Sequence, residues 1–281
     1  MPPVSVEEEN QQMDFAIQPE DQHAYELARM RHSCAHLMAE AVLEIFPDAK
    51  FAIGPAIENG FYYDIDLPRG LTPDDLVEIE SRMKVHQKAA EPFERKVVSK
   101  DEALQIFGDN PYKVELIQGF ADGETITTYQ QGSFLDLCRG PHVDDTSATG
   151  AFKLQSVAGA YWRGDENRPM LQRIYGTSWQ SQAELDDYLH KLEEAQRRDH
   201  RRLGKELDLF SVNEEIGPGL ILWHPKGAMV RFLVEQFEQH EQLARGYDLV
   251  YTPHIASEKI YKTSGHLETY GENMSAPMSI E

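Results

Sequence analysis

Three histidines and one cysteine stand at spacings that can bring their side chains together. His32 and His36 are four residues apart in RHSCAHLM, so on a helix both imidazoles project from one face, a single turn apart. Cys138 and His142 in DLCRGPHV bracket Gly140-Pro141, a step that favours a tight loop. Such a group can either hold a tetrahedral metal ion or transfer protons and position water in a hydrolytic cleft. Spacing alone leaves both chemistries open.

Length and composition narrow the class of protein. The chain has 281 residues, of which 41% are apolar, enough for two modest domains with hydrophobic cores. No apolar run reaches membrane-spanning length, and MPPVSVEEEN lacks the basic and apolar regions of a signal peptide. The two cysteines, Cys34 and Cys138, argue against a disulfide framework and for a reducing compartment. We therefore expect a cytoplasmic protein without a membrane segment.

The charge distribution leaves binding to nucleic acid open. A formal net charge of −21 is unfavourable for contact with phosphates. Five cations nevertheless recur at i, i+3 and i+4 spacing near the end of an expected helix: Arg197, Arg198, Arg201, Arg202 and Lys205. Taken alone, this cluster is typical of a solvated helix face that Glu193, Glu194 and Asp199 balance. Composition therefore neither shows nor excludes RNA binding.

One long helix is predicted to carry His32 and His36. It spans residues 20–46 and ends before Pro47. At 100° per residue, its apolar sector holds Leu27, Met30, Cys34, Leu37, Ala41 and Ile45. Its polar sector holds Glu26, Arg29, Ser33, Glu40 and Glu44. The two histidines fall on a border of the polar sector, as a cleft requires, whereas Cys34 points away and is expected to pack in the core.

The segments after this helix favour an α+β domain. Residues 51–67 are predicted to form a hairpin whose positive-φ turn is Asn59-Gly60. Further strands are expected within residues 123–130, 151–164 and 170–179, separated by Gly-rich turns. Mixed short helices and strands of this kind are typical of an α+β fold.

Local signals fix where several helices begin. Thr72, followed by a proline, starts a helix that runs to about Ala90. Ser99 and Glu102 form a capping box for a shorter helix, and Pro111 opens another. These starts rest on neighbouring residues only, so they do not depend on the rest of the fold.

The last third of the chain has a different pattern. Ser181 and Glu184 form a capping box that opens a helix to roughly Leu203. Pro225 starts an amphipathic helix through about Arg245. RGYDLVYTPHI is then predicted to contain a short apolar strand that Pro253 ends. We expect this part to be a separate unit.

Six motifs occur in an order that resembles bacterial-type threonyl-tRNA synthetases. They are HxxxH, IGPAIENGFYYD, CRGPH, AGAYWRGD, MLQRIYGTSW and RRDHRRLGKELDLF, and the match runs from about Tyr25 to Glu281. The resemblance implies an editing (second additional) domain at 25–179, a linker helix at 180–205, and the beginning of a class II aminoacylation core at 206–281. Motif 1, the helix–strand unit at the dimer interface, would include Pro253. An acidic, mobile lead-in occupies 1–24.

Two departures from this family alter what is expected of the chain. The small ubiquitin-like domain that usually precedes the editing domain is replaced by the acidic lead-in. The sequence also ends before motifs 2 and 3 and before the Cys and His residues that hold the catalytic zinc. We therefore expect a truncated gene product or a fragment without the ATP and threonine sites. ATP, Mg²⁺ and the catalytic zinc would belong to the absent part of the core.

The resemblance also implies a reaction. A missing methyl group changes discrimination by only about 1–3 kcal/mol, so an enzyme for threonine also activates serine and needs a second site that hydrolyses seryl-tRNA(Thr). The implied editing residues are His32, His36, Lys113, Asp136, Cys138 and His142. Arg197, Arg198, Arg201, Arg202 and Lys205 would contact tRNA(Thr) phosphates. The family forms homodimers through motif 1 once the core is complete.

Two other functions remain open from the sequence. A free-standing alanyl-type editing hydrolase shares the HxxxH and CxxxH spacing and would bind zinc through His32, His36, Cys138 and His142. A non-enzymatic module would use the same closed zinc site only to brace its fold. AGAYWRGD, the arginine-rich linker and motif 1 argue against the free-standing hydrolase, which needs none of them. Whether the quartet holds zinc is not decided by sequence.

Overall fold

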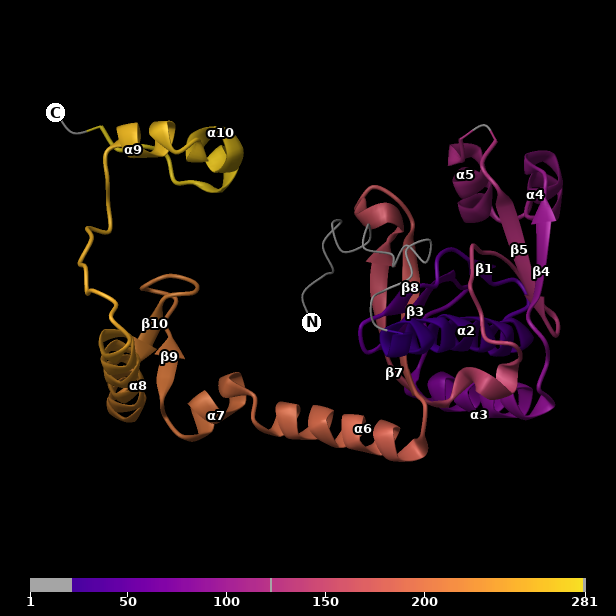
Figure 1. Ribbon diagram of the computed structural model, residues 1–281, viewed down its shortest axis with the longest axis horizontal. Helices are drawn as coiled ribbons and strands as arrows, with labels where there is room; N and C mark the ends of the chain where they lie inside the picture. Colours follow the sequence, from indigo (N-terminus) through magenta and orange to yellow (C-terminus); the bar gives the residue numbers. More distant parts are fainter. Residues whose placement is uncertain (1–21, 122, 280–281) are drawn as a thin grey trace. The chain divides into compact units, whose positions relative to one another are not determined.

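A computed structural model describes residues 22–121 and 123–279, coloured along the chain in Figure 1. This part divides into two compact units between Glu194 and Ala195, and each is described by itself. Nearly all of the predicted acidic lead-in, residues 1–24, lies outside the described residues, and residues 22–24 form the first turn of a helix. None of the described helices combines the length and apolar character needed to cross a membrane.

Helix α2 (Gln22–Ile45) is the centre of the first unit and confirms the long helix predicted from the sequence. It contacts β3 and β8 of one sheet, β6 of another, and the neighbouring helix α3. Cys34 is fully buried in the main core, as expected. Ser33 and Glu40 of the predicted polar sector, however, are 0% and 1% exposed, so this sector is buried at both positions. Periodicity assumes one buried face, whereas α2 is covered on several sides.

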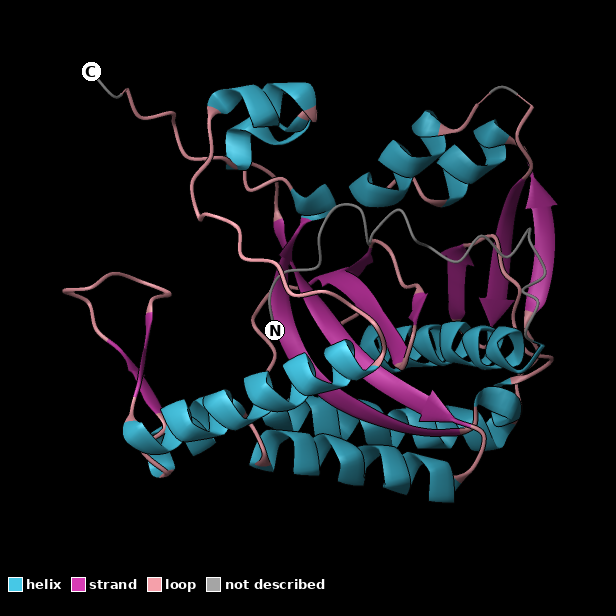
Figure 2. Cartoon of the chain, turned by 60° about the vertical axis from the view of Figure 1, so that its left-hand side comes forward, coloured by secondary structure: helices cyan, strands magenta, loops and turns pink. Residues whose placement is uncertain are grey.

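The larger sheet is antiparallel with strand order β1-β3-β8-β7, and β2 pairs with β3. Its strands are β1 (Lys50–Phe51), β2 (Ala56–Ile57), β3 (Gly60–Asp66), β7 (Ala151–Tyr161) and β8 (Met170–Trp179). Strands β7 and β8 form a long hairpin that carries a bulge between Leu154 and Ser156. Figure 2 shows these curved strands with helices packed along one face. Side chains such as Phe61, Tyr63 and Ile174 join this sheet to α2 in the main core.

The predicted Asn59-Gly60 turn is displaced by one residue. Ile57 pairs with Gly60, so the two turn residues are Glu58 and Asn59, and neither Asn59 nor Gly60 has a positive φ. Gly60 is instead required by the neighbouring strand, because a Cβ at this position would lie 2.1 Å from the carbonyl oxygen of Gly176. The sequence suggested that Gly60 forms a turn, but its role is to let two strands pack closely.

A second antiparallel sheet has the order β4-β5-β6 and completes the α+β class predicted from the sequence. Its strands are β4 (Glu94–Val98), β5 (Ile126–Gln131) and β6 (Phe134–Leu137). Besides α2 and most of α6 (Gln182–Arg197), this unit contains helices α3 (Pro73–Ala89), α4 (Lys100–Ile106) and α5 (Pro111–Gly119), with short 3-10 helices η1 (Thr146–Thr149) and η2 (Trp162–Gly164).

The predicted helix starts are confirmed. Thr72 and Ser99 each close a capping box, with Asp75 and Glu102 respectively at the third helical position. Asn110 accepts from two backbone N–H groups at the start of α5. These capping bonds form among adjacent residues and fix where α3, α4 and α5 enter the domain.

The predicted linker is two helices rather than one. Helix α6 (Gln182–Arg197) ends, and α7 (His200–Glu206) begins after Asp199, whose side chain accepts from the N–H of Arg201. The carboxylate of Asp199 is an effective N-cap, so it favours a new helix start over continuation. The helix predicted to reach Leu203 is therefore interrupted at Arg198 and Asp199.

Short helices and strands and one longer helix make up the rest of the second unit. Strands β9 (Phe210–Val212) and β10 (Ile221–Trp223) pair with each other, and α8 (Pro225–Ala244) confirms the predicted amphipathic helix. Helices α9 (Glu258–Thr263) and α10 (His266–Tyr270) and the turn η3 (Gly271–Asn273) follow.

The strand predicted in RGYDLVYTPHI does not form. Residues 247–253 have no regular secondary structure, and Val250 and Tyr251 are 79% and 91% exposed. A strand is stabilised by hydrogen bonds to a neighbour, and among the described residues none pairs with this segment. The beginning of a class II core therefore stays a prediction.

Candidate functional site

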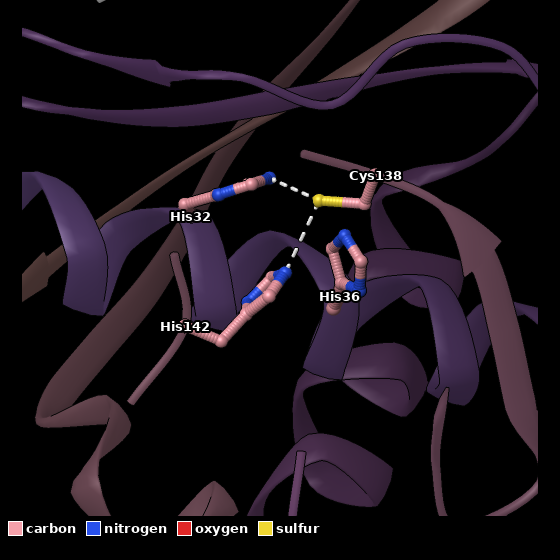
Figure 3. A group of neighbouring side chains, drawn as sticks. All are labelled: His32, His36, Cys138 and His142. Carbon is pink, nitrogen blue, oxygen red and sulfur yellow. Dashed lines mark hydrogen bonds between the residues drawn. The ribbon is translucent and has the colours of Figure 1, made fainter. Parts of the chain in front are cut away.

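The four residues singled out by their spacing converge on one point. His32 and His36 project from α2, Cys138 directly follows β6, and His142 follows the Gly140-Pro141 step. One ligand-type atom from each side chain lies within 4.8 Å of every other. Figure 3 shows the three imidazoles grouped around the thiol.

Direct contacts to the sulfur hold this quartet together. Cys138 Sγ lies 3.3 Å from His32 Nε2 and 3.2 Å from His142 Nε2, the two contacts dashed in Figure 3. The backbone N–H of Gly140 donates to the same sulfur at 3.2 Å. Gly140 has a φ of 71°, a conformation that glycine adopts readily, so the loop can turn its N–H towards the thiol.

Ser33 orients His142. Its hydroxyl donates to the carbonyl of Arg29 at 2.9 Å, one turn earlier on α2, and accepts from the N–H of Val143 at 2.9 Å. The remaining lone pair faces His142 Nδ1 at 3.0 Å. A serine hydroxyl has one donor and two acceptor sites, so this pattern assigns the His142 proton to Nδ1. The lone pair of Nε2 is then directed at Cys138.

A buried charged group lies beside the quartet. Lys113 Nζ of α5 is 2.6 Å from Asp136 Oδ1, with the side chains 3% and 5% exposed. Asp136 also accepts from the hydroxyl of Tyr63 and from the N–H of Leu137, and lies 3.5 Å from His36 Nε2. Burial opposes ionisation, but the Lys113 charge and these hydrogen bonds bring the pKa of Asp136 below its ordinary value. The residues form an ion pair against His36.

A cavity of about 800 Å³ opens onto these groups. His32, His36, Cys138, Lys113 and Asp136 line it, together with apolar residues of the β1–β2 segment and the edge of β5. His142 does not line the cavity and lies behind the thiol, where Phe93 stacks on its ring with centroids 4.7 Å apart and 2° between planes. The cavity therefore exposes two imidazoles, a thiol and an ion pair to an entering molecule.

Burial keeps the imidazoles neutral. It lowers the pKa of His32 to about 4 and that of His36 to about 3, and the pKa of His142 falls well below its usual value for the same reason. Burial and the Asp136 charge raise the pKa of the Cys138 thiol to about 12. At neutral pH the group holds three neutral imidazoles and a protonated thiol, so its nitrogens can accept protons.

The donor set also suits a metal ion. In a tetrahedral zinc site, ligand atoms lie roughly 3.4–3.6 Å apart, and the 3.2 and 3.3 Å contacts of Cys138 are close to that spacing. Neutral imidazoles and a cysteine are zinc ligands, and the Ser33 contact resembles the outer hydrogen bond that fixes metal-binding histidines. His32, His36, Cys138 and His142 therefore could hold a metal ion such as zinc.

The predicted tRNA-binding cations are placed differently. Arg197 ends α6, Arg198 lies in the break, and Arg201, Arg202 and Lys205 belong to α7. All five are exposed. Arg201 pairs with Asp199 at 2.6 Å, and Arg202 approaches Glu206 at 3.6 Å. They do not form a row on one continuous helix, so their role in binding stays a prediction.

Sequence reasoning missed three residues of the site. Ser33 was assigned only to the polar sector of the helix, Tyr63 reaches Asp136 from a strand 73 positions away, and Phe93 covers His142 from the segment before β4. Only Ser33, which lies between the two histidines of HxxxH, carried a local signal. The other two contacts depend on how β3 and the loop before β4 fold onto α2.

Comparisons with known proteins identify the relatives of this chain. The profile of the Threonyl and Alanyl tRNA synthetase second additional domain matches residues 126–175. A threonine–tRNA ligase of Dehalococcoides mccartyi is 61% identical over 256 residues, 91% of this chain and 44% of that protein. Threonine–tRNA ligases of Pelobacter propionicus and Borrelia hermsii are 57% and 52% identical, over 88% and 91% of this chain and 39% and 44% of their own length. The chain thus spans about two fifths of the curated relatives it matches.

Proposed function

Because the chain belongs by sequence to the threonine–tRNA ligase family, we propose that its first unit proofreads by hydrolysing mischarged seryl-tRNA(Thr). The observation that carries this proposal is the cavity of about 800 Å³ into which His32, His36 and Cys138 face beside the Lys113–Asp136 pair. Hydrolysis of an aminoacyl ester needs a proton acceptor for water, stabilisation of an oxyanion and a proton for the leaving ribose hydroxyl. The cavity supplies groups for each.

The neutral imidazoles are suited to proton transfer. His32 or His36 accepts a proton from water as the water attacks the ester carbonyl, and returns it to the departing ribose oxygen. Burial keeps both rings unprotonated at working pH but also makes them weaker bases than a free imidazole, so the proton transfer relies on the nearby Asp136 carboxylate to stabilise the imidazolium that forms. The products are free serine and tRNA with an intact terminal hydroxyl.

Lys113 and Asp136 supply the charges. The Lys113 ammonium stabilises negative charge on the carbonyl oxygen in the transition state. Asp136 fixes this ammonium at 2.6 Å and can also orient His36 or bind the α-ammonium of the amino acid. Their burial strengthens both effects, because the surroundings screen charge less than water does.

A metal ion at the quartet would add one function. Zinc held by three of His32, His36, Cys138 and His142, with the fourth position open, would supply Lewis-acid polarisation of a bound oxygen, and the ligating histidines would then not act as the base. The chain's own contribution then includes the orientation of His142 by Ser33 and the electrostatic role of Lys113 and Asp136. The proposal that the ion is zinc rests on the donor set of three imidazoles and a thiol.

Selectivity follows from size. Threonine differs from serine by one methyl group, so a hydrolytic site that excludes this methyl by steric conflict spares correctly charged tRNA. The selectivity of the hydrolytic site for serine over threonine multiplies the selectivity of the synthetic site for threonine over serine. The whole relatives are threonine–tRNA ligases, and we propose that ATP-dependent threonylation and homodimer formation through motif 1 belong to the longer protein.

A free-standing editing hydrolase is less consistent with the comparisons. The match to the Dehalococcoides ligase covers 256 residues, more than the 155 residues of the expected editing domain at 25–179. The similarity therefore extends into the linker and the segment beyond it. A purely structural zinc module is the other alternative, and it predicts that seryl-tRNA is not hydrolysed.

The test is deacylation of purified aminoacyl-tRNA. We expect the chain to hydrolyse seryl-tRNA(Thr) and spare threonyl-tRNA(Thr), and His32→Ala to lower the rate by at least about a hundredfold, the usual scale for an acid–base group. His190→Ala, an exposed histidine on α6, is the matched control and should retain the rate. Equal hydrolysis of both substrates would refute selectivity, an active His32→Ala protein would refute a catalytic role for His32, and an active His32→Ala/His36→Ala protein would refute the assigned chemistry.

A further inference from the structure

A second group of ligand-type side chains lies one helical turn beyond the quartet. His32, His36, Glu40 and Glu44 are spaced four residues apart on α2, so they share one face of that helix. Glu40 lies near His86 of α3 and Glu91, just after α3, and the ligand atoms of these three are within 4.8 Å of one another. Helices α2 and α3 pack against each other in this region.

The contacts of His86 leave one nitrogen directed at two carboxylates. Its Nε2 is 3.1 Å from Glu44 Oε1, so a ring that carries one proton has it on Nε2. Its Nδ1 then presents a lone pair to Glu40 Oε2 at 3.5 Å and Glu91 Oε2 at 3.7 Å. Both distances exceed those of N–H···O hydrogen bonds and are near the ligand–ligand spacing around a small divalent ion.

The carboxylates of Glu40 and Glu91 are only partly satisfied by hydrogen bonds. Glu40 is 1% exposed, and its Oε1 accepts from the N–H of Ser133 at 2.7 Å. Glu91 Oε2 is buried and has no hydrogen-bond partner among the described residues. Burial and the neighbouring Glu40 charge raise the pKa of Glu91. Two carboxylates are thus brought together beside His86, and no Lys or Arg of the described residues forms an ion pair with either of them.

Gln131 provides an independent indication. It is 1% exposed, and its amide faces Glu40 with Nε2 3.3 Å from Oε2. Its Oε1 is buried and lacks a hydrogen-bond partner in the part of the chain that the structure describes. A buried amide oxygen without a donor is costly, so the polar groups around Glu40 are incompletely satisfied at Gln131 as well as at Glu91. The adjacent Gly132 allows this approach, because a Cβ there would lie 2.3 Å from Glu40 Oε1 and 2.4 Å from Glu91 Oε2.

We propose that Glu40, His86 and Glu91 bind a divalent transition-metal ion at a site separate from the His/Cys quartet. Two carboxylates and one imidazole suit Zn²⁺ or Mn²⁺ better than Mg²⁺, which prefers oxygen ligands. The Glu44–His86 contact matches the carboxylate–histidine–metal arrangement that fixes ring orientation. The ion joins α2, α3 and the segment before β4, and so stabilises the helix that carries His32 and His36. This site does not depend on the proposed hydrolytic function.

Metal titration of the purified full chain tests the proposal. After removal of metal, Co²⁺ binding is followed by the thiolate charge-transfer absorption, which reports Cys138, and by total bound metal, which reports all sites. We expect Glu91→Gln to remove one equivalent of metal without changing the thiolate signal. Glu44→Gln, which alters the outer contact of His86 and the surface ion pair with Arg82 but none of the three proposed ligands, should weaken binding at this site about 10–100-fold. Glu94→Gln, on the exposed face of β4, is the matched control and should change neither reading.

Thermal unfolding of the metal-free proteins separates the alternatives. We expect Mn²⁺ or Zn²⁺ to raise the melting temperature of a Cys138→Ala protein, in which the quartet lacks its thiol, and Glu91→Gln to abolish this rise. If a proton shared by Glu40 and Glu91 balances the pair instead, Glu91→Gln will leave metal content unchanged and will not destabilise the chain. That result, or an unaltered metal stoichiometry in His86→Gln, overturns the proposal.

Discussion

Two sets of side chains at helical spacing have opposite structural outcomes. His32 and His36 lie on α2, which is covered on several sides, and their rings are fixed by contacts from β6 and the loop after it. The arginines at 197–202 lie on exposed helices that break at Asp199. Sequence periodicity predicts the same arrangement for both sets, a row of side chains along one helix face. A row of side chains becomes a defined site when its helix is continuous and other elements surround it.

The charged groups of the two regions differ in the same way. Asp136 and Lys113 are almost completely buried, whereas the pair of Lys191 and Asp187 on α6 is 72% and 60% exposed although its atoms are 2.5 Å apart. Similar distances therefore correspond to different energies. Water screens the exposed pair, while removal of one buried partner leaves an uncompensated charge.

The largest effect is expected from breaking the buried pair. Lys113→Met should lower the free energy of unfolding by about 3–5 kcal/mol, because it leaves the Asp136 carboxylate buried without its cation. Urea denaturation measures this change. Lys191→Met is the matched control and should have a near-zero effect, since its partner stays solvated. If the double variant Lys113→Met/Asp136→Asn were as unstable as Lys113→Met, the loss would come from packing and not from the unpaired charge.

A pH effect should distinguish the buried histidines from exposed ones. The pKa of His32 is lowered to about 4 and that of His36 to about 3 in the folded chain, so between these values and about 6.5 the unfolded state binds more protons. Stability is therefore lost as pH falls, by up to about 1.4 kcal/mol per pH unit for each histidine. Urea midpoints measured in a chelator between pH 7 and pH 5 would show this slope.

Variants test whether the buried histidines cause this dependence of stability on pH. His36→Gln should make stability less dependent on pH in this range, because one buried imidazole that must gain a proton is removed. His190→Gln, in which an exposed ring is replaced, should leave the slope as it is. Equal slopes in all three proteins would mean that other groups cause the acid sensitivity.

Features that depend on neighbouring residues could be predicted from the sequence, whereas features that depend on distant residues mostly could not. The capping boxes at Thr72 and Ser99 form between neighbouring residues, so their pattern was sufficient. The convergence of His32 with Cys138 was inferred from spacing together with family resemblance, since 106 positions separate the two. Burial of Glu40 could not be inferred, because periodicity does not reveal that β6 also covers α2.

Two errors concern signals that compete within a segment. Asp199 favours a helix start inside an otherwise helical pattern, and RRDH contained this information. The apolar residues of 247–253 fit a strand, but strand formation requires a pairing partner, which no local pattern provides. The helical and apolar patterns of the two segments are present in the sequence, but they did not predict the helix break at Asp199 or the absence of a strand at 247–253.

A smaller effect is expected at the residue that orients His142. Ser33→Ala removes the hydroxyl that faces His142 Nδ1 and accepts from Val143. We expect deacylation of seryl-tRNA(Thr) to slow about 10–100-fold, as for loss of an outer hydrogen bond to a site histidine, with little change in KM. Ser33→Thr, which keeps the hydroxyl, should restore most of the rate. An unchanged kcat in Ser33→Ala would show that His142 needs no such orientation.

The exposed arginines should give the smallest effect and the sharpest contrast with the quartet. If they contact tRNA phosphates, reversal of Arg198 and Arg201 to glutamate should reduce the slope of log affinity against log salt concentration by about one to two units. The value should be nearer one, because Arg201 already pairs with Asp199 at 2.6 Å and must leave that carboxylate to reach a phosphate. The saturated hydrolytic rate should stay nearly constant, since these residues affect binding and not the reaction. Arg245→Glu, at the end of α8, provides the matched control. An unchanged salt slope in the double reversal would show that the arginines form only a solvated helix surface, which is the simplest interpretation of their spacing.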